Sequence, residues 1–362
     1  MKPMRFSFYA ALLLGIMLVS CNNNKSENTV KIGLVLGLSG NGSVNGKYHL
    51  EGYKMAIEEQ NKKGGILGKK IELDIQDSKL DPKEGLISIK NMYESSLPPF
   101  IVCSNGSPVS MAIKPEVEKN KSIFLAAAAA SKLIENSNYT IRNYVDAKTI
   151  SENMVPYITD SLKLKKLGIF YVDNDFGKSV SNSIIAKIKG TNLNNTFIEN
   201  FNDKESDFKS LLSKITPSTE IIYVIGVGKG LGILIKQIKE SGYKGKIIAD
   251  PLSNTAEVKN AAGQSILGIR YLDFAFDNKS ESKKIKEFVQ SYKKSFGKEP
   301  SDIAALSYVG LKLVFKSIEE VGEFDSKKII QNLEKIKNIE SIMGGVSVSE
   351  RSFIYPFVFE IY

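Results

Sequence analysis

The sequence predicts an α/β protein made of two doubly wound lobes, each a largely parallel sheet with helices on both faces. Apolar runs typical of strands alternate with amphipathic runs typical of helices from residue 30 to about residue 270. The alternation starts afresh at about residue 147, as a second lobe would require. The chain has 362 residues, which is enough for two domains of about 150 residues each.

The elements expected in the first lobe follow in regular order. Strands are expected at residues 30–36, 70–76, 100–104 and 122–127, and helices at about 48–62, 81–95 and 108–120. Gly64 and Gly65 end the first of these helices. Asp81 and Pro82 are typical of the N-cap and first residue of the second helix. The run of alanines at 126–130 ends a strand, where the backbone is expected to approach another group closely.

The second series of elements is equally regular. Strands are expected at 166–172, 195–201, 219–226 and 244–250, and helices at 147–163, 177–189, 206–215 and 230–241. Beyond about residue 270 the pattern becomes mostly helical, at 281–296, 301–321 and 326–337. A strand-like segment at 352–362 ends the chain. We therefore expect the chain to cross back between the lobes instead of forming a third domain.

The N-terminus carries a targeting signal. Lys2 and Arg5 precede an apolar stretch at 7–20 that is short for a membrane span, and Leu18-Val19-Ser20-Cys21 resembles the bacterial lipobox. The sequence thus predicts a signal peptide over 1–20, lipid attachment at Cys21 and a polar tether over 21–29. An ordinary signal peptide or an anchor helix that contains a cysteine is the alternative. The expected protein lies outside the cytoplasm, anchored to a membrane without spanning it.

Composition argues against several functions. The net charge of +9 is spread over helical faces and interspersed with acids, so no nucleic-acid partner is expected. His49 is the only histidine, which leaves little material for a histidine-dependent catalytic pair or a multi-histidine metal site, and it is expected to be an ordinary residue near a helix start. Cys103 is expected to be a buried strand residue. No cofactor, metal or catalysed reaction is predicted.

Several motifs together resemble one known family. They are VKIGLVLGLSGNGSVNG at 30–46, N-x-x-GG-I-x-G-x-x-I at 61–71, D-x-x-x-D-P at 77–82, the segment 142–146, YVDNDFGKS at 171–179, and Asp207-Phe208. In this order and spacing they resemble the branched-chain amino-acid-binding family of extracytoplasmic solute-binding proteins. The likeness covers nearly all of the chain after residue 29.

The resemblance implies the type I periplasmic-binding fold, in which crossover strands join two α/β lobes that close on a small ligand by a hinge motion. It implies a monomer with a ligand cleft between the lobes. The lobes are expected at residues 30–146 plus about 274–345, and at 147–273 plus about 346–362.

On one wall of the cleft, the resemblance implies two turns that grip the ligand's carboxylate. Gly106 and Ser107 fall at the first turn, where only Ser107 keeps a hydroxyl. Ala129, Ala130 and Ser131 fall at the second, where the hydroxyl would come from Ser131. Both serines precede helical segments, so helix capping is the alternative role for each.

The opposite wall departs from the family's pattern. Phe176 stands for an aromatic residue that covers the ligand, and a second aromatic position falls on Gly228. The acid that pairs with the ligand's ammonium falls near Leu252, with Asp250 two residues away. Because a buried ammonium needs a carboxylate partner, either Asp250 substitutes or the ligand lacks an amine.

Two glycine-rich turns resemble phosphate-binding loops. GLSGNGSVNG at 37–46 lies between a strand and a helix, and GVGKGLG at 226–232 does the same, but the second lacks the G-x-G-x-x-G spacing and no P-loop motif is present. We interpret both as turns at the cleft, whose glycines allow close approach to a solute and to the other lobe. Asn45 stands where the resembling family often has a ligand-facing aromatic residue.

The expected function is therefore that of a lipid-anchored receptor that delivers an amino acid or a similar small polar ligand, such as a carboxylate, to an ABC-type permease. A receptor of the same fold that signals ligand occupancy is the alternative. An enzyme is a third class, for which the sequence offers no nucleophile motif or metal cluster.

Overall fold

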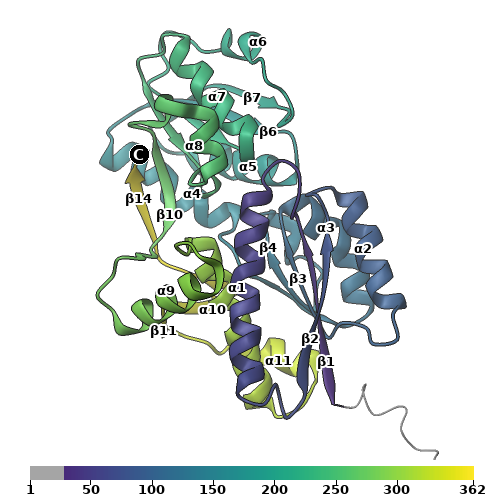
Figure 1. Cartoon of the computed structure of the whole chain (residues 1–362). Coiled ribbons are helices and arrows are strands. Elements are labelled where there is room, and N and C mark those ends of the chain that lie inside the picture. The colour runs from purple at the N-terminus through teal and green to yellow at the C-terminus, as the bar shows by residue number, and fades with distance from the viewer. Residues whose placement is uncertain (1–27) are drawn as a thin grey trace, which may run out of the picture.

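A computed structural model describes residues 28–362 and confirms the two-lobed α/β architecture (Figure 1). The first lobe contains an eight-stranded sheet with strand order β11-β12-β13-β5-β4-β3-β1-β2. The second contains a six-stranded sheet with order β14-β10-β9-β8-β6-β7. Both sheets are parallel in their centres and antiparallel at one edge, where β12 pairs with β11 and β13, and β14 pairs with β10.

The first lobe is built from two parts of the chain. Its N-terminal part comprises β1 (Thr29–Leu36), α1 (Ser43–Lys62), β2 (Lys70–Asp77), α2 (Pro82–Glu94), β3 (Ile101–Asn105), α3 (Ser107–Lys119), β4 (Ile123–Ala127) and β5 (Thr140–Arg142). Its C-terminal part comprises α9 (Lys283–Phe296), α10 (Asp302–Val321), α11 (Ser326–Leu333), β11 (Ile339–Ser341), β12 (Gly344–Ser349) and β13 (Ser352–Ile354).

The second lobe is formed by the middle of the chain and its last strand. Its elements are α4 (Ala147–Pro156), β6 (Lys166–Val172), α5 (Asp175–Ile188), β7 (Asn194–Phe201), α6 (Lys209–Leu212), β8 (Ile221–Ile225), α7 (Gly228–Glu240), β9 (Lys246–Ala249), α8 (Ala256–Ala262), β10 (Arg270–Phe274) and β14 (Phe357–Ile361).

Several boundaries differ from the sequence-based expectation. Helix α1 begins at Ser43, earlier than expected, and α4 gives way at Tyr157 to a wider π-helical turn. The expected helix at 206–215 is reduced to α6. Strands β12 and β13 pair within the sheet of the first lobe, so only β14 of the segment expected in the second lobe, 346–362, joins the second sheet. Edge pairing, which sequence periodicity does not encode, decides this division.

The core of each lobe surrounds its central strands. All residues of β3, β4 and β8 are buried, as expected for parallel strands covered on both faces. Helix α1 packs against α10 through Gly52, where an added Cβ would lie 2.2 Å from the Ala304 carbonyl oxygen. Cys103 is a free, buried residue of β3, which confirms its predicted structural role.

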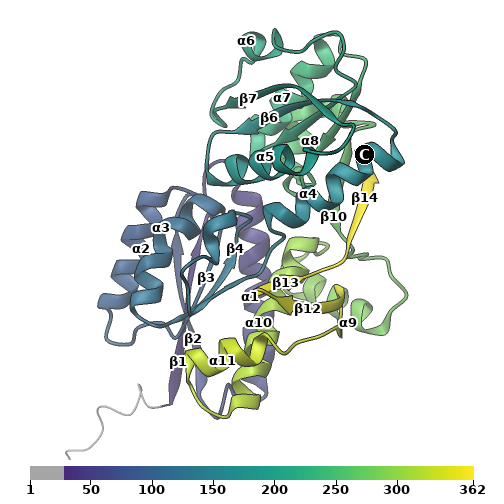
Figure 2. The same ribbon diagram turned by 180° about the vertical axis from the view of Figure 1, so that it is seen from behind.

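The chain passes between the lobes three times, after β5, after β10 and after β13 (Figure 2). One aromatic residue near each crossing joins a common cluster. The ring of Phe274 meets Tyr144 edge-on at 5.5 Å between centroids and Tyr355 at 5.9 Å. The Tyr355 hydroxyl donates to Asn143 Oδ1 at 2.6 Å, which ties the third crossing to the first.

Within residues 28–362, none of the helices is both long enough and apolar enough to cross a membrane. The predicted signal peptide and the lipid-attachment residue Cys21 lie outside the described residues, as does most of the tether.

Candidate functional site

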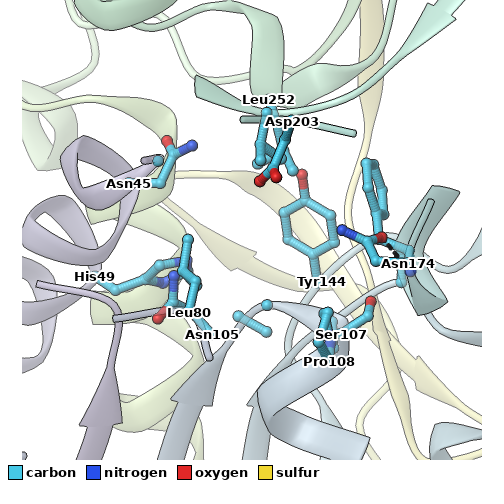
Figure 3. Close-up of a pocket in the computed structure, with 17 residues that line it drawn as sticks. Asn45, His49, Leu80, Asn105, Ser107, Pro108, Tyr144, Asn174, Asp203 and Leu252 are labelled. Atoms are coloured by element: carbon cyan, nitrogen blue, oxygen red, sulfur yellow. Dashed lines mark hydrogen bonds between the residues drawn. The ribbon is translucent and has the colours of Figure 1, made fainter. Parts of the chain in front are cut away.

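A cavity of about 690 Å³, including the solvent at its mouth, lies between the two lobes (Figure 3). Its walls come from the loops and helix starts that follow nine strands, β1 to β5 in the first lobe and β6 to β9 in the second. This is where ligands bind in open α/β sheets, because helix N-termini and loops meet at the carboxyl ends of the strands.

Ser107 and Gly106 lie where β3 ends and α3 begins. Gly106 has φ +84°, and an added Cβ would lie 2.9 Å from Leu80 Cδ2, so a larger residue would be strained in both respects. The buried Ser107 Oγ accepts a hydrogen bond from the Ala130 amide at 3.1 Å. Its own hydroxyl proton remains available for a ligand. Within residues 28–362 no side chain caps α3, so the free amides at its start add a partial positive charge at the cavity.

Two further polar groups point into the cavity without a protein partner. The Tyr144 hydroxyl is buried and forms no hydrogen bond within residues 28–362. Asn45 is 6% exposed and lines the same cavity; its side-chain amide is likewise unpaired within the described chain. Burial above all, with the charge of Asp250 next, raises the pKa of Tyr144 well above its usual value, so the hydroxyl remains a donor. An unsatisfied buried polar group costs about 1–3 kcal/mol, which a polar ligand would offset.

Arg142 positions the loop after β4. It is 2% exposed, and its guanidinium donates to the carbonyl oxygens of Ala128 and Ala130 at 2.9 and 3.1 Å. Burial lowers its pKa to about 10, which leaves it charged at neutral pH. The loop therefore presents Ala129 to the cavity in a fixed orientation.

His49 lines the cavity, contrary to its expected role as an ordinary residue near a helix start. Its Nδ1 lies 2.7 Å from Ser307 Oγ on α10. Complete burial lowers the pKa of His49 to about 3, so the imidazole is neutral at physiological pH. It contributes hydrogen bonding and shape without charge.

In the second lobe, Phe176 and Leu252 reach the cavity, as expected from the sequence. The Asn174 side chain caps α5 by accepting from the amides of Phe176 and Gly177 at 3.0 and 3.1 Å. Sequence reasoning missed Asn174, Asp203 and, in the first lobe, Leu80. Each follows a strand directly, so the rule that loops after parallel strands form the site could have found them.

Four predicted residues do not line the cavity. The Ala130 carbonyl is bound by Arg142, and Ser131 is exposed. Asp250 is fully buried, and its carboxylate accepts from the amides of Gly226 and Leu252, each at 2.7 Å. Burial raises its pKa to about 7. Asp250 therefore stabilises the loops after β8 and β9 and does not face the cavity.

Gly228, the fourth of these residues, contacts the opposite lobe. It has φ +63°, and an added Cβ would lie 2.2 Å from Asn41 Oδ1. Asn41 belongs to the glycine-rich turn at 37–46, which reaches from the first lobe to the start of α7 (Figure 1). The glycine thus provides room for a contact between lobes, where the resemblance had implied a contact with ligand.

Asn41 joins the lobes through both ends of its amide. Its Oδ1 accepts from the Lys229 amide at 2.8 Å, which caps α7, and its Nδ2 donates to Asp203 Oδ2 at 3.1 Å. The Gly42 amide, at the N-terminus of α1, donates to the Glu257 carboxylate at 3.1 Å. A carboxylate of the second lobe thus occupies the place at this helix start that a phosphate would take, which argues against the nucleotide interpretation.

The geometry defines a two-lobed ligand-binding protein whose cleft lies between α/β lobes joined at a three-stranded hinge. Comparison with known proteins gives the family. The sequence pattern described as periplasmic binding protein matches residues 29–352, so the chain belongs to that family. Membership implies a solute-binding protein located outside the cytoplasm.

Individual relatives agree with this assignment. The leucine-, isoleucine-, valine-, threonine- and alanine-binding protein of Pseudomonas aeruginosa is 24% identical over 349 residues, 93% of this chain and 90% of the relative. A leucine-binding protein from Thermotoga maritima has a TM-score of 0.85 at 23% identity, over 92% of this chain and 95% of its own. A Rhodopseudomonas palustris ABC-transporter solute-binding protein, solved with 3,4-dihydroxybenzoic acid, has a TM-score of 0.79 at 22% identity. The match covers 92% of this chain and 93% of that protein's chain.

The contact made by Asn41 predicts a measurable effect on lobe closure. Asn41→Ala removes the cap of α7 and the contact with Asp203, so the lobes should separate more readily. Loss of a helix cap corresponds to roughly 0.5–2 kcal/mol, or about twofold to thirtyfold in the closed population. Small-angle X-ray scattering should give a larger radius of gyration than for the wild type or for Asn192→Ala, a change at an exposed loop residue. Equal radii would contradict the role of Asn41.

The burial of His49 predicts an unusual titration. In the folded protein its imidazole should not titrate between pH 5 and pH 8, whereas in urea it should titrate near pH 6.5, as for an unperturbed histidine. The unfolded state therefore gains a proton as the pH falls below about 6.5 and the folded state does not, so this group lowers stability toward acid pH. Proton NMR of the single histidine measures its titration in the folded state and in the unfolded state. A folded-state midpoint near 6.5 would disprove its burial.

Proposed function

We propose that this protein is a lipid-anchored receptor that binds an amino acid or a similar small polar ligand between its lobes and presents it to an ABC-type permease. The observation that carries the proposal is the set of unpaired donors in the first lobe. Asn45, the Tyr144 hydroxyl, the Ser107 hydroxyl and the uncapped start of α3 all meet one cavity. Such donors suit a carboxylate, which backbone amides and hydroxyls can hold without an arginine.

The ligands of similar proteins support the proposal that the ligand of this protein carries a carboxylate. The Pseudomonas relative is described as binding five amino acids. A similar structure from Streptococcus pneumoniae holds isoleucine, and the two Rhodopseudomonas structures hold 3,4-dihydroxybenzoic acid and benzoate. All these molecules share a carboxylate, whereas their other groups differ between the amino acids and the benzoates. We infer that the first lobe binds this common group and that the second lobe determines which molecule is taken.

The proposal includes a transport role without catalysis. The Streptococcus protein is a transporter substrate-binding protein, and both Rhodopseudomonas proteins belong to ABC transporters. All named relatives are binding proteins, which fits a function without a chemical step. Among residues 28–362 no group of three or more His, Cys, Asp or Glu side chains could hold a metal ion. Closure on the ligand would then provide the signal that a permease recognises.

The proposed hydrogen bond from Ser107 to the ligand's carboxylate is tested with Ser107→Ala. The mature chain should show a higher melting temperature with at least one member of a panel of amino acids, short carboxylates and benzoates. Ser107→Ala should weaken binding of that compound by roughly tenfold to a hundredfold, because a hydrogen bond to a charged group contributes about 1.5–3 kcal/mol. Ser131→Ala is the control, since Ser131 lies outside the cavity. Unchanged affinity in Ser107→Ala, measured by calorimetry, would show that the Ser107 hydroxyl does not bind the ligand's carboxylate.

The anchor is tested with Cys21→Ala in the full-length chain. The wild type should sediment with membranes and incorporate a radiolabelled fatty acid, whereas Cys21→Ala should lose the label. The matched control is Cys103→Ala, which removes a buried thiol and should keep the label. Equal labelling of wild type and Cys21→Ala would show that the lipid is absent or attached elsewhere.

A further inference from the structure

The charge of the cavity is unbalanced. Of the residues that line it, Asp203 is the single acid, and none is a lysine or an arginine. The one histidine is neutral because burial lowers its pKa to about 3. The walls therefore carry one negative charge, located in the second lobe and facing the neutral donors of the first.

Asp203 is held in a defined position. It follows β7, and its backbone carbonyl packs against Gly230 of α7, where an added Cβ would lie 2.4 Å from the Asp203 oxygen. Asn41 donates to Oδ2 at 3.1 Å. The other oxygen, Oδ1, has no hydrogen-bond partner within residues 28–362, and the carboxylate forms no salt bridge there. Figure 3 shows the carboxylate beside Leu252, at the same end of the cavity as the Tyr144 hydroxyl.

Asp203 is half-buried, and a ligand that fills the cleft would remove more water from its carboxylate. Removing a charge from water is costly unless an opposite charge compensates it. Asn41 is a neutral amide, so it orients the carboxylate without neutralising it. Asp250 is already satisfied by two backbone amides, and Leu252 is apolar. Asp203 is thus the one described cavity residue that can receive a positive charge from a ligand.

We propose that Asp203 pairs with an ammonium or similar cationic group of the ligand, which makes the ligand a zwitterion with its carboxylate toward Ser107. This assignment rests on the proposed function and narrows it: simple carboxylates, such as benzoates, lack the group that Asp203 needs. It also assigns the cation contact to the loop after β7, a position that sequence reasoning did not consider.

The test compares paired ligands on matched variants. Calorimetry is run with the amino acid that gives the largest rise in melting temperature, with its analogue lacking the amino group (for leucine, 4-methylpentanoate), and with benzoate. Asp203→Asn keeps the size of the side chain and removes its charge. Asp207→Asn, at a side chain that is 67% exposed in the same loop, is the control. Asn41→Ala tests the support of Asp203, because it removes the donor to this carboxylate together with the contact between the lobes.

Asp203→Asn should weaken binding of the amino acid at least tenfold and leave the deaminated analogue within about twofold, while Asp207→Asn changes neither. Asn41→Ala should weaken both ligands because it acts on closure, and the amino acid more strongly because it also releases the Asp203 carboxylate. If the wild type prefers the deaminated acid or benzoate, and Asp203→Asn binds them equally well, the cation assignment is wrong while the proposed function stands. If the wild type binds no probe, the proposed function itself fails.

Discussion

Buried polar groups without protein partners are the constraint on which the rest of this structure depends. The Tyr144 hydroxyl is buried at the cavity with no partner among the described residues, and the Asn45 amide lines the same cavity without a hydrogen bond to a described residue. Folding tolerates such groups where another molecule completes their hydrogen bonds. The surrounding architecture keeps them there: Tyr144 is fixed in the aromatic cluster of the hinge, and Asn45 stands in the first turn of α1. The cleft is therefore prepared for a ligand.

The two walls have different tasks. The first lobe presents neutral donors on rigid supports, since Arg142 holds the loop after β4 and Ser107 is bonded to the Ala130 amide. The second presents apolar surface, the Asn174 side chain and one carboxylate. Asn41 connects the walls, because one side chain caps a helix and orients Asp203. Closure and ligand recognition thus share a residue, which couples the position of the lobes to the charge that a ligand meets.

Much of the fold could be predicted from sequence, because alternating strands and helices carry their periodicity locally. The cavity positions of Asn45, Ser107, Phe176 and Leu252 also followed, since each stands near a strand end. The place of Asp203 at the cleft could have been inferred from the end of β7, but its orientation depends on Asn41, 162 residues away, which only the fold reveals. Asp250 was misjudged for a related reason: only the fold reveals that two backbone amides occupy its carboxylate.

The most direct test of this account is a crystal structure of residues 22–362 grown with the compound that raises the melting temperature most. A ligand carboxylate should lie within hydrogen-bond distance of the Ser107 hydroxyl and the free amides at the start of α3, and the Tyr144 hydroxyl and the Asn45 amide should have gained ligand partners. A ligand bound outside this cavity, or bound within it with Tyr144 and Asn45 still unpaired, would contradict the account.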